Sequence, residues 1–309
     1  MGGHLVPNAS FTSGITAITN YLHPLGFKLA LYTANGVTVC DETITGSYGN
    51  ETTDANDLAS WGVDGLKDDN CATAATCPYC NYLTMSYALL NNSSQRPMFF
   101  EVCQQVEDPR IVGISNSQRT VDDLSDDWNH IIYALQLNDE YASTSQPGSY
   151  NEPFFIFEGT TGGTATETEN RTQFYMDCMQ AAPLIFGLDP TSASAAAITV
   201  LENQDMISID QDPLCNAAVT ISTSDSGNAI VYSKILTGTN TRAIAFLNTD
   251  SSSQVMTANF GQAGLPNGYF EVRDCETHID MGKYYNFYGP VTVASHATTV
   301  IKVTQPQWW

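Results

Sequence analysis

The chain has 309 residues, which is enough for a large buried core and for more than one domain. Only 14% of the residues are charged, and the formal net charge is -22. So acidic a chain has no basic surface to neutralise phosphates, which excludes electrostatic binding of nucleic acid and favours a neutral substrate. No apolar stretch approaches the length of a transmembrane span, so we expect no membrane partner.

In the first part of the chain, segments with helical spacing alternate with short strand-like runs. Apolar spacing predicts helices over 11–25, 53–61, 82–90, 127–137, 167–182 and 194–203. Runs of strand-forming residues predict strands over 27–32, 62–67 and 97–103. Strands that alternate with helices indicate an α/β fold with a parallel sheet and right-handed crossover connections.

The pattern changes after Gln211-Asp212-Pro213. Short alternating runs separated by Ser, Gly and Asn clusters follow, which is typical of an antiparallel β-sandwich. We expect its strands over 218–221, 229–235, 242–247, 254–260, 268–273 and 298–303. The predicted domains are therefore residues 1–213 and residues 214–309.

Eight cysteines and several Asn-x-Ser/Thr sequons favour an oxidising, glycosylating compartment. We therefore expect a secreted, extracellular glycoprotein with disulfide bonds. The first residues, Met1 to Leu5, have neither the basic start nor the apolar run of a signal peptide, so we expect that the N-terminus is missing. The sequons are those of Asn8, Asn50, Asn91, Asn92 and Asn170.

The segment Trp61 to Cys71 combines a strand with a cluster of ionisable residues. Side chains alternate along a strand, so Lys67 and Asp69 point to one side and Asp68 to the other. Barrel enzymes carry their chemistry at the carboxyl ends of such strands. Lys67 would hold Asp69 ionised, and a poorly solvated carboxylate can act as a nucleophile. By itself, however, an Asp-Asp-Asn run is more typical of a turn or a helix cap.

Six segments taken in chain order resemble family 27 of the glycoside hydrolases, the α-galactosidases and α-N-acetylgalactosaminidases. The resemblance implies a (β/α)8 TIM-type barrel over residues 1–213, incomplete at its N-terminus, and a C-terminal antiparallel β-sandwich domain over 214–309. It also implies a hydrolase that cleaves terminal α-galactosyl residues from oligosaccharides, galactosylated polysaccharides or glycoconjugates and needs no cofactor or metal. The segments are Gly26–Tyr32 with Gly36 and Cys40, Trp61–Cys71, Gln118–Asp123 with Trp128, Pro147–Pro153, Ala182–Leu184, and Leu201–Asn203 with Asp210–Pro213.

The resemblance assigns the two catalytic carboxyl groups. Asp69 would be the nucleophile and Asp123 the acid/base. A retaining glycosidase needs two carboxyl groups roughly 5–5.5 Å apart, one to attack the sugar and one to protonate the leaving oxygen. Asp123 must then keep its proton near the working pH, which requires burial or a nearby negative charge. Asp122 is the competing acid, and only the spacing of the motif favours Asp123.

The resemblance also assigns a substrate-binding set. Tyr32, Lys67 and Arg119 would lie on the sugar, and a Cys40–Cys71 disulfide would border the site. Gln104 is counted in the same set, although Gln104-Gln105 stands where the family usually has Trp.

The sequence departs from the family's pattern in ways that weaken sugar binding. The family's first two strands have no counterpart, so we expect exposed strand edges in the barrel. Gln118 stands where the family usually has Trp, and Glu152-Pro153-Phe154-Phe155 stands where it usually has Asp-Pro-Asp-Met. The alternative hypothesis is therefore a truncated or non-catalytic relative with weak or no sugar binding.

The remaining cysteines admit several interpretations. Cys77-Pro78-Tyr79-Cys80 matches a glutaredoxin tetrapeptide and precedes a predicted helix, but the small domain and the preceding strand are absent. We therefore favour a loop disulfide over a redox function. Zinc is not favoured, because no fourth ligand has a suitable spacing. Cys215 and Cys275 are expected to bridge the second domain.

Overall fold

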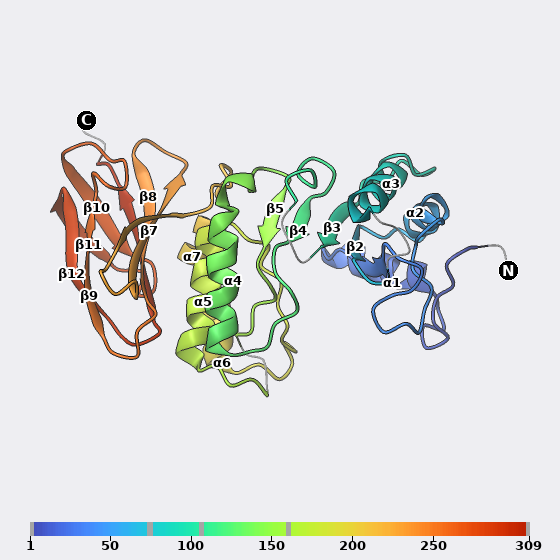
Figure 1. Ribbon diagram of the computed structural model, residues 1–309, viewed down its shortest axis with the longest axis horizontal. Coiled ribbons are helices and arrows are strands. Elements are labelled where there is room, and N and C mark those ends of the chain that lie inside the picture. Colours follow the sequence, from blue (N-terminus) through green and yellow to red (C-terminus); the bar gives the residue numbers. More distant parts are fainter. Residues whose placement is uncertain (1–2, 73–76, 105–107, 159–161, 307–309) are drawn as a thin grey trace. The chain divides into compact units, whose positions relative to one another are not determined.

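The computed structural model describes residues 3–72, 77–104, 108–158 and 162–306 (Figure 1). The chain divides into two compact units, Met1–Arg119 and Thr120–Trp309. Among the described residues, no helix combines the length and the apolar character needed to cross a bilayer.

Unit 1 is a parallel β/α unit (Figure 1). Its strands follow one another in the sheet in chain order, and each neighbouring pair is parallel. Helices α2 and α3 connect β1 to β2 and β2 to β3, as the alternating sequence pattern predicted. The elements are α1 (Ile15–Leu22), a 3-10 turn η1 (His23–Leu25), β1 (Ala30–Ala34), α2 (Glu51–Ser60), β2 (Gly65–Asp69), α3 (Pro78–Leu90), β3 (Phe99–Cys103) and β4 (Ser117–Arg119).

The strand register of unit 1 places two rows of side chains on one face of the sheet. One row joins Tyr32, Lys67, Glu101 and Ser117 across the four strands, and the next joins Ala34, Asp69 and Cys103 across β1 to β3. Successive side chains in a strand alternate between faces, so residues two apart share a face. The opposite face packs under α2 and α3 in a core that contains Leu58, Leu66, Tyr82, Met85 and Val102.

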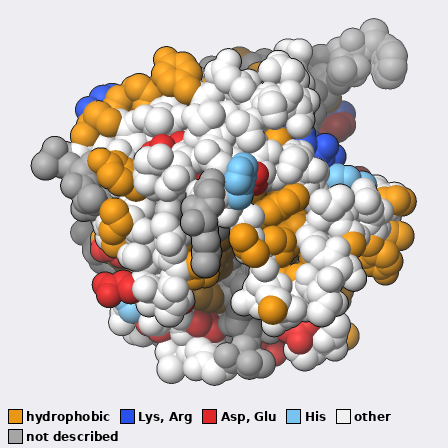
Figure 2. Space-filling model, turned by 90° about the vertical axis from the view of Figure 1, so that its right-hand side faces the viewer, with side chains coloured by type: hydrophobic (Ala, Val, Ile, Leu, Met, Phe, Trp, Pro, Cys, Tyr) orange, Lys and Arg blue, Asp and Glu red, His pale blue; other side chains and the backbone are white. Residues whose placement is uncertain are grey.

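Strand β1 is the last strand of the sheet on its side, where it pairs with β2. A groove of about 490 Å³ lies next to it, lined by residues that include Phe11, Leu31 and Ile44. The strand edge that we expected to be exposed is therefore present in unit 1. Hydrophobic side chains reach the surface on the face shown in Figure 2. The exposed large hydrophobic residues among the first fifty are Val6, Phe11, Tyr21, Leu25, Phe27, Tyr32, Val37, Ile44 and Tyr48.

Unit 2 begins with a helical layer. Helix α5 lies between α4 and α7 and packs on strands β8 and β13 (Figure 1). Its first turn carries a capping box, in which Thr166 and Glu169 each bond the other's backbone N–H. The elements are α4 (Trp128–Glu140), a 3-10 turn η2 (Ala142–Thr144), β5 (Tyr150–Glu152), α5 (Glu167–Gln180), α6 (Ala195–Leu201) and α7 (Gln204–Asp210).

The rest of unit 2 is antiparallel. One sheet has the strand order β11-β10-β13-β8-β7-β6, and a second sheet pairs β12 with β9. Phe246, Met256, Phe260 and Phe270 fill the core between them. The predicted sandwich is confirmed. Its strands are β6 (Val219–Thr223), β7 (Ala229–Leu236), β8 (Thr241–Asn248), β9 (Gln254–Asn259), β10 (Tyr269–Asp274), β11 (Asp280–Tyr285), β12 (Phe287–Val293) and β13 (Thr298–Thr304).

Candidate active site at the carboxyl end of the parallel sheet

Asp69 is the last residue of β2, and its carboxylate is held from two sides. Oδ1 accepts a hydrogen bond of 2.8 Å from the backbone N–H of Asn70, and Oδ2 accepts one of 3.0 Å from the hydroxyl of Tyr32. The backbone carbonyl of Asp69 accepts from the N–H of Asn35 at 2.8 Å. The side chain is half-buried and is therefore both oriented and open to solvent.

Tyr32 reaches Asp69 from the neighbouring strand β1. Burial and the charge of Asp69 raise the pKa of the Tyr32 phenol well above its usual value, so the hydroxyl keeps the proton that it donates. Tyr32 is 47% exposed, so one side of its ring is available to a bound molecule. The same hydroxyl lies 3.0 Å from Sγ of Cys40.

The Cys40–Cys71 disulfide implied by the family resemblance is present and borders Asp69. Sγ of Cys40 lies 3.2 Å from Oδ2 of Asp69. The loop from β1 approaches this bridge very closely, because a Cβ atom on Gly36 would lie 1.9 Å from the carbonyl oxygen of Cys71. Only glycine fits there. Cys40, Cys71 and Asp69 place possible metal ligands within 4.8 Å of one another, but sulfurs joined in a disulfide are not thiolates and do not offer a soft metal site.

Lys67 lies on the same face as Asp69, as predicted, but its ion pair is with Glu101. Nζ of Lys67 and Oε1 of Glu101 are 3.0 Å apart, and the two side chains are 18% and 12% exposed. The structure thus gives the lysine a carboxylate on the neighbouring strand that was not predicted, and the expected effect of Lys67 on the charge of Asp69 stays a prediction. Glu101 was missed from the sequence, although it directly faces Lys67 in the strand register.

Arg119 and Cys103 complete the polar face of unit 1. Arg119 ends β4 and is 3% exposed. Burial raises the pKa of the Cys103 thiol to about 12, while the charge of Arg119 opposes the shift and Asp69 adds to it. With its pKa raised so far, the Cys103 thiol stays protonated and is not a nucleophile. Cys103 was not among the site residues predicted from the sequence.

The other predicted site residues occupy different surroundings. Gln104 follows β3 and is half-buried. Gln105 lies outside the described residues. Asp122 and Asp123 belong to unit 2, where both are exposed in the segment before α4. The burial that we expected around Asp123 is therefore not seen.

The remaining cysteines agree with one expectation and contradict another. Cys77 and Cys80 form the predicted local disulfide. Cys215 and Cys275 do not bridge the second domain, because both are free thiols. Cys275 is buried beside the carbonyl oxygen of Arg273, whereas Cys215 is half-exposed and lies 3.9 Å from the hydroxyl of Tyr150.

Parallel β/α units that carry acidic and basic side chains at the carboxyl ends of their strands are the architecture of barrel enzymes. With the antiparallel sandwich appended, the fold defines a barrel enzyme with a C-terminal β-domain. Residues 2–212 match the family model described as alpha galactosidase A, and residues 226–303 match the one described as alpha galactosidase C-terminal beta sandwich domain. The chain belongs to the alpha-galactosidase family, family 27 of the glycoside hydrolases.

Individual relatives agree with this assignment. An alpha-galactosidase of Coffea arabica is 37% identical over 281 residues, which cover 89% of this chain and 72% of that protein. Alpha-galactosidase 2 of Arabidopsis thaliana is 36% identical over 267 residues, which cover 85% of this chain and 66% of that protein. The crystal structure of alpha-galactosidase I from Mortierella vinacea superposes with a TM-score of 0.87 at 26% identity and covers 94% of this chain and 80% of that one. The chain thus spans about two thirds of the length of these two curated relatives.

Proposed function

We propose that this protein is a retaining glycoside hydrolase that removes terminal α-galactosyl residues. The support is its membership of a family whose matched relatives are named alpha-galactosidases, together with the position of Asp69. Asp69 carries the proposal. It stands at the carboxyl end of a parallel strand, and two hydrogen-bond donors fix its carboxylate while the side chain stays open to solvent.

In the proposed reaction the carboxylate of Asp69 attacks the anomeric carbon of the galactosyl group. Attack forms a covalent glycosyl-aspartate as the bond to the leaving oxygen breaks, and Asp123 gives that oxygen a proton. Asp123 then takes a proton from the water that hydrolyses the intermediate. The donors from Tyr32 and Asn70 hold one orientation of the carboxylate, which lowers the entropic cost of attack.

The substrate-binding roles are part of the same proposal. Lys67 and Arg119 supply hydrogen-bond donors to sugar hydroxyls, and Tyr32 lines the entrance with an exposed ring. Gln104 contributes an amide beyond the end of β3. The Cys40–Cys71 bridge forms the wall next to Asp69. The substrates would be α-galactoside oligosaccharides and galactosylated polymers or glycoconjugates, neutral molecules that suit a chain with a net charge of -22.

We also infer that the protein works in a secretory or extracellular compartment. Cys40–Cys71 and Cys77–Cys80 are both disulfides, a state that persists in oxidising surroundings. The sequons of Asn8 and Asn91 lie on exposed residues and could carry glycans.

A non-catalytic relative remains the second candidate, and a specific observation favours it. Among the described residues of unit 1, β1 is the end strand of its sheet, and an apolar groove lies beside it next to Tyr32, one of the proposed sugar contacts. A sugar held on such a surface would lose many of the contacts that a closed barrel gives.

The deciding experiment compares three purified forms with p-nitrophenyl α-galactoside at mildly acidic pH. The wild type should release nitrophenol, and Asp69→Asn should reduce release by more than about 10³-fold. Asp68→Asn is the matched control, because it removes the adjacent carboxyl from the opposite face of the same strand and should leave activity within about twofold. No release from a cooperatively folded wild type, or equal loss in both variants, would contradict the proposal.

A second measurement tests the mechanism. A 2-deoxy-2-fluoro-galactosyl donor should leave a stable glycosyl group on the peptide that contains Asp69, detected by mass spectrometry. Asp123→Asn should lower the rate by about 10²–10⁴-fold on a poor leaving group but much less on nitrophenol, which leaves without protonation. Inversion of the anomeric centre would exclude the double displacement.

A further inference from the structure

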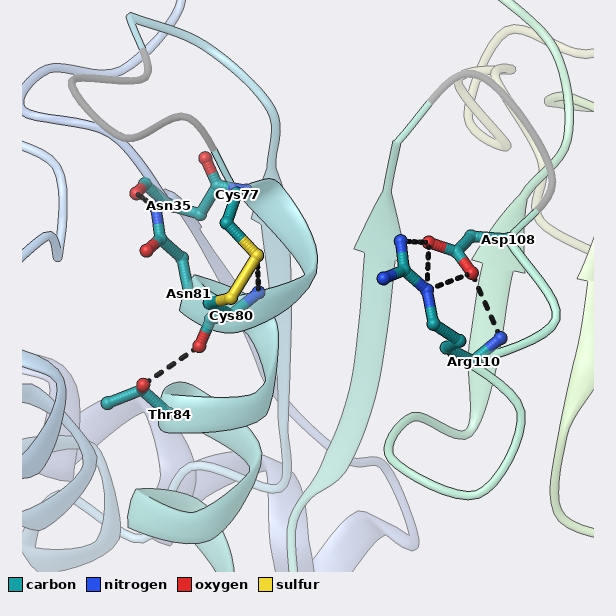
Figure 3. Close-up of a disulfide and its surroundings, with 7 residues drawn as sticks. All are labelled: Asn35, Cys77, Cys80, Asn81, Thr84, Asp108 and Arg110. Atoms are coloured by element: carbon teal, nitrogen blue, oxygen red, sulfur yellow. Dashed lines mark hydrogen bonds and ion pairs between the residues drawn. A yellow bond between two sulfur atoms is a disulfide. The ribbon is translucent and has the colours of Figure 1, made fainter.

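The disulfide between Cys77 and Cys80 lies outside the candidate active site, at the start of helix α3 (Figure 3). Cys77 is the residue that caps the helix, and Pro78 occupies the first turn. The sulfur of Cys77 accepts a hydrogen bond of 3.3 Å from the backbone N–H of Cys80. The same N–H also donates to the backbone carbonyl oxygen of Cys77 at 3.0 Å, so the sulfur and the carbonyl share one donor of the first helical turn.

That contact favours the thiolate form of Cys77. A negative sulfur at the N-terminus of a 13-residue helix is stabilised by the N–H that it accepts and by the positive end of the helix dipole. The first turn of α3 contains no acidic residue that would oppose this effect. Arg110 lies 4.6 Å from the ring of Tyr79, between the two cysteines, but Asp108 pairs with its charge (Figure 3). The helix terminus is therefore the main source of stabilisation.

The first turn is rigidly held and its disulfide can be reached. The side-chain amide of Asn81 donates to the carbonyl oxygen of Asn35 at 3.0 Å, and the Thr84 hydroxyl donates to that of Cys80 at 2.8 Å (Figure 3). Cys80 is exposed, whereas Cys77 is half-buried. Cys80 is therefore the more open half of the disulfide to an incoming thiol of small size, while the sulfur of Cys77 lies against the helix end.

We propose that Cys77 and Cys80 are a thiol–disulfide exchange site for low-molecular-weight thiols, separate from the glycosidase site. The thiolate of the incoming molecule attacks Sγ of Cys80 and forms a mixed disulfide. The Cys77–Cys80 bond breaks, and its electron pair leaves on Sγ of Cys77, where the N–H of Cys80 stabilises it. The thiol with the lower pKa is the better leaving group, which gives the direction of attack.

A second molecule of the thiol completes the exchange. Its thiolate attacks the thiol-derived sulfur of the mixed disulfide, which releases Cys80 and forms the disulfide of the small molecule. Protons from the two incoming thiols end on Cys77 and Cys80. The protein disulfide is reduced by two electrons and two thiols are oxidised to one disulfide, so atoms and electrons balance. The reverse sequence oxidises Cys77 and Cys80 again.

The chain contains its own reference disulfide. Cys40–Cys71 spans 31 residues, whereas Cys77–Cys80 spans 3. Closing a longer loop constrains the unfolded chain more, so reduction of Cys40–Cys71 is the more unfavourable of the two. In a series of buffers of reduced and oxidised glutathione, alkylation and peptide mass spectrometry should show Cys77 and Cys80 reduced at ratios that leave Cys40–Cys71 intact. Equal resistance of both disulfides would overturn the proposal.

A matched pair of variants tests the part played by the helix terminus. Cys80→Ser leaves Cys77 as the thiol at the cap, and Cys77→Ser leaves Cys80 as a thiol without that hydrogen bond. Rates of alkylation against pH should give a midpoint for Cys77 that lies about one unit or more below that of Cys80. The double variant Cys77→Ser/Cys80→Ser supplies the background from the free thiols Cys103, Cys178, Cys215 and Cys275.

Coincident midpoints in the two single variants would also overturn the proposal. If a substitution disturbs the start of α3, peptide-resolved glutathione titration of the wild type still tests the proposal, because it needs no variant. Release of nitrophenol by the double variant should equal that of the wild type, which keeps this test independent of the proposed glycosidase function.

Discussion

Lys67 and Glu101 stand opposite each other on β2 and β3 and bring an ammonium and a carboxylate to 3.0 Å in a largely buried position. A lysine in such a place needs a carboxylate, because an unpaired buried charge is costly. Glu101 supplies one, and in the next row of the same face Asp69 accepts hydrogen bonds from Tyr32 and Asn70. The ion pair is therefore a positioning element next to the candidate nucleophile.

Glu101→Gln removes the charge of this pair and keeps the shape of the side chain. We expect a loss of roughly 1–3 kcal/mol in the free energy of unfolding, measured in urea at pH 7, because Lys67 stays buried while the carboxylate that faces it is lost. The variant should also raise KM more than it lowers kcat if Lys67 binds the sugar. In a double-mutant cycle with Lys67→Met, a coupling energy near zero would show that the pair contributes nothing.

The rules of strand geometry predicted that Lys67 and Asp69 share a face of the sheet, but they did not predict the ion pair between Lys67 and Glu101. Alternation along a strand was enough to place Lys67 and Asp69 on one face, because it depends only on their spacing. The contact with Glu101 depends on the register between β2 and β3, two strands separated by a helix, and no local pattern sets that register. Cys103 was missed for the same reason, since it faces Asp69 across the same two strands.

Element boundaries failed where tertiary contacts outweigh local preference. Strand β1 was predicted over 27–32 from its apolar residues, yet the strand is Ala30–Ala34, because its pairing with β2 begins at Ala30. Strands β11 and β12 were missed altogether. Most of their side chains are exposed or half-exposed, so they lack the alternation of buried and exposed positions that identified the other strands.

Asp68 should make the protein less stable as the pH rises. Its side chain is 1% exposed, and neither carboxylate oxygen has a hydrogen-bond partner in the part of the chain that the structure describes. Burial, helped by the charge of Asp69, raises the pKa of Asp68 well above its usual value. The pKa of an aspartate in the unfolded chain is near 3.9. When the pKa is higher in the folded state, the carboxyl contributes its full stability below the unfolded-state pKa. This contribution is lost as the pH rises through the folded-state pKa.

Asp68→Asn removes this ionisation. We expect it to raise the free energy of unfolding at pH 7 by about 1–3 kcal/mol and to change it little at pH 4. Urea denaturation of both forms across this pH range gives the comparison. A stability gain that does not depend on pH would show that Asp68 is not the group that titrates.

The contact between Tyr232 and Asp139 gives a second pH dependence, within unit 2. The hydroxyl of Tyr232, on β7, donates to Oδ2 of Asp139, on α4, at 2.6 Å. Burial raises the pKa of Asp139 to about 6, although the hydrogen bonds from Tyr232 and Gln180 act against the rise. The stability that Asp139 contributes is therefore present below pH 4 and is lost as the pH rises through about 6.

Tyr232→Phe removes one of the two donors and should raise the pKa of Asp139 further. The cost in free energy of unfolding should be roughly 1–3 kcal/mol at pH 7, where the carboxylate is charged, and smaller at pH 4. Tyr175→Phe is the control, because Tyr175 is equally buried and Asp139 is not among the groups that shift its pKa. The interpretation fails if both variants lose the same amount of stability at both values of pH.

Glycosylation should distinguish two adjacent asparagines. Asn91 is exposed, whereas Asn92 is 1% exposed and its side-chain amide donates to the carbonyl oxygens of Leu89 and Arg96. A glycan on Asn92 would break both hydrogen bonds and could not fit in the folded chain, so we expect modification at Asn91 only.

The two sequons overlap but can be removed one at a time by single substitutions. In protein secreted from a eukaryotic host, Ser93→Ala destroys the sequon of Asn91 and keeps that of Asn92, whereas Ser94→Ala does the opposite. Ser93→Ala should therefore lose one glycan by mass, and Ser94→Ala should keep it. The side chain of Ser93 is not needed for local structure in unit 1, because its contact with Asn56 is made by the backbone N–H. A glycan that persists in folded Ser93→Ala would show that Asn92 becomes accessible.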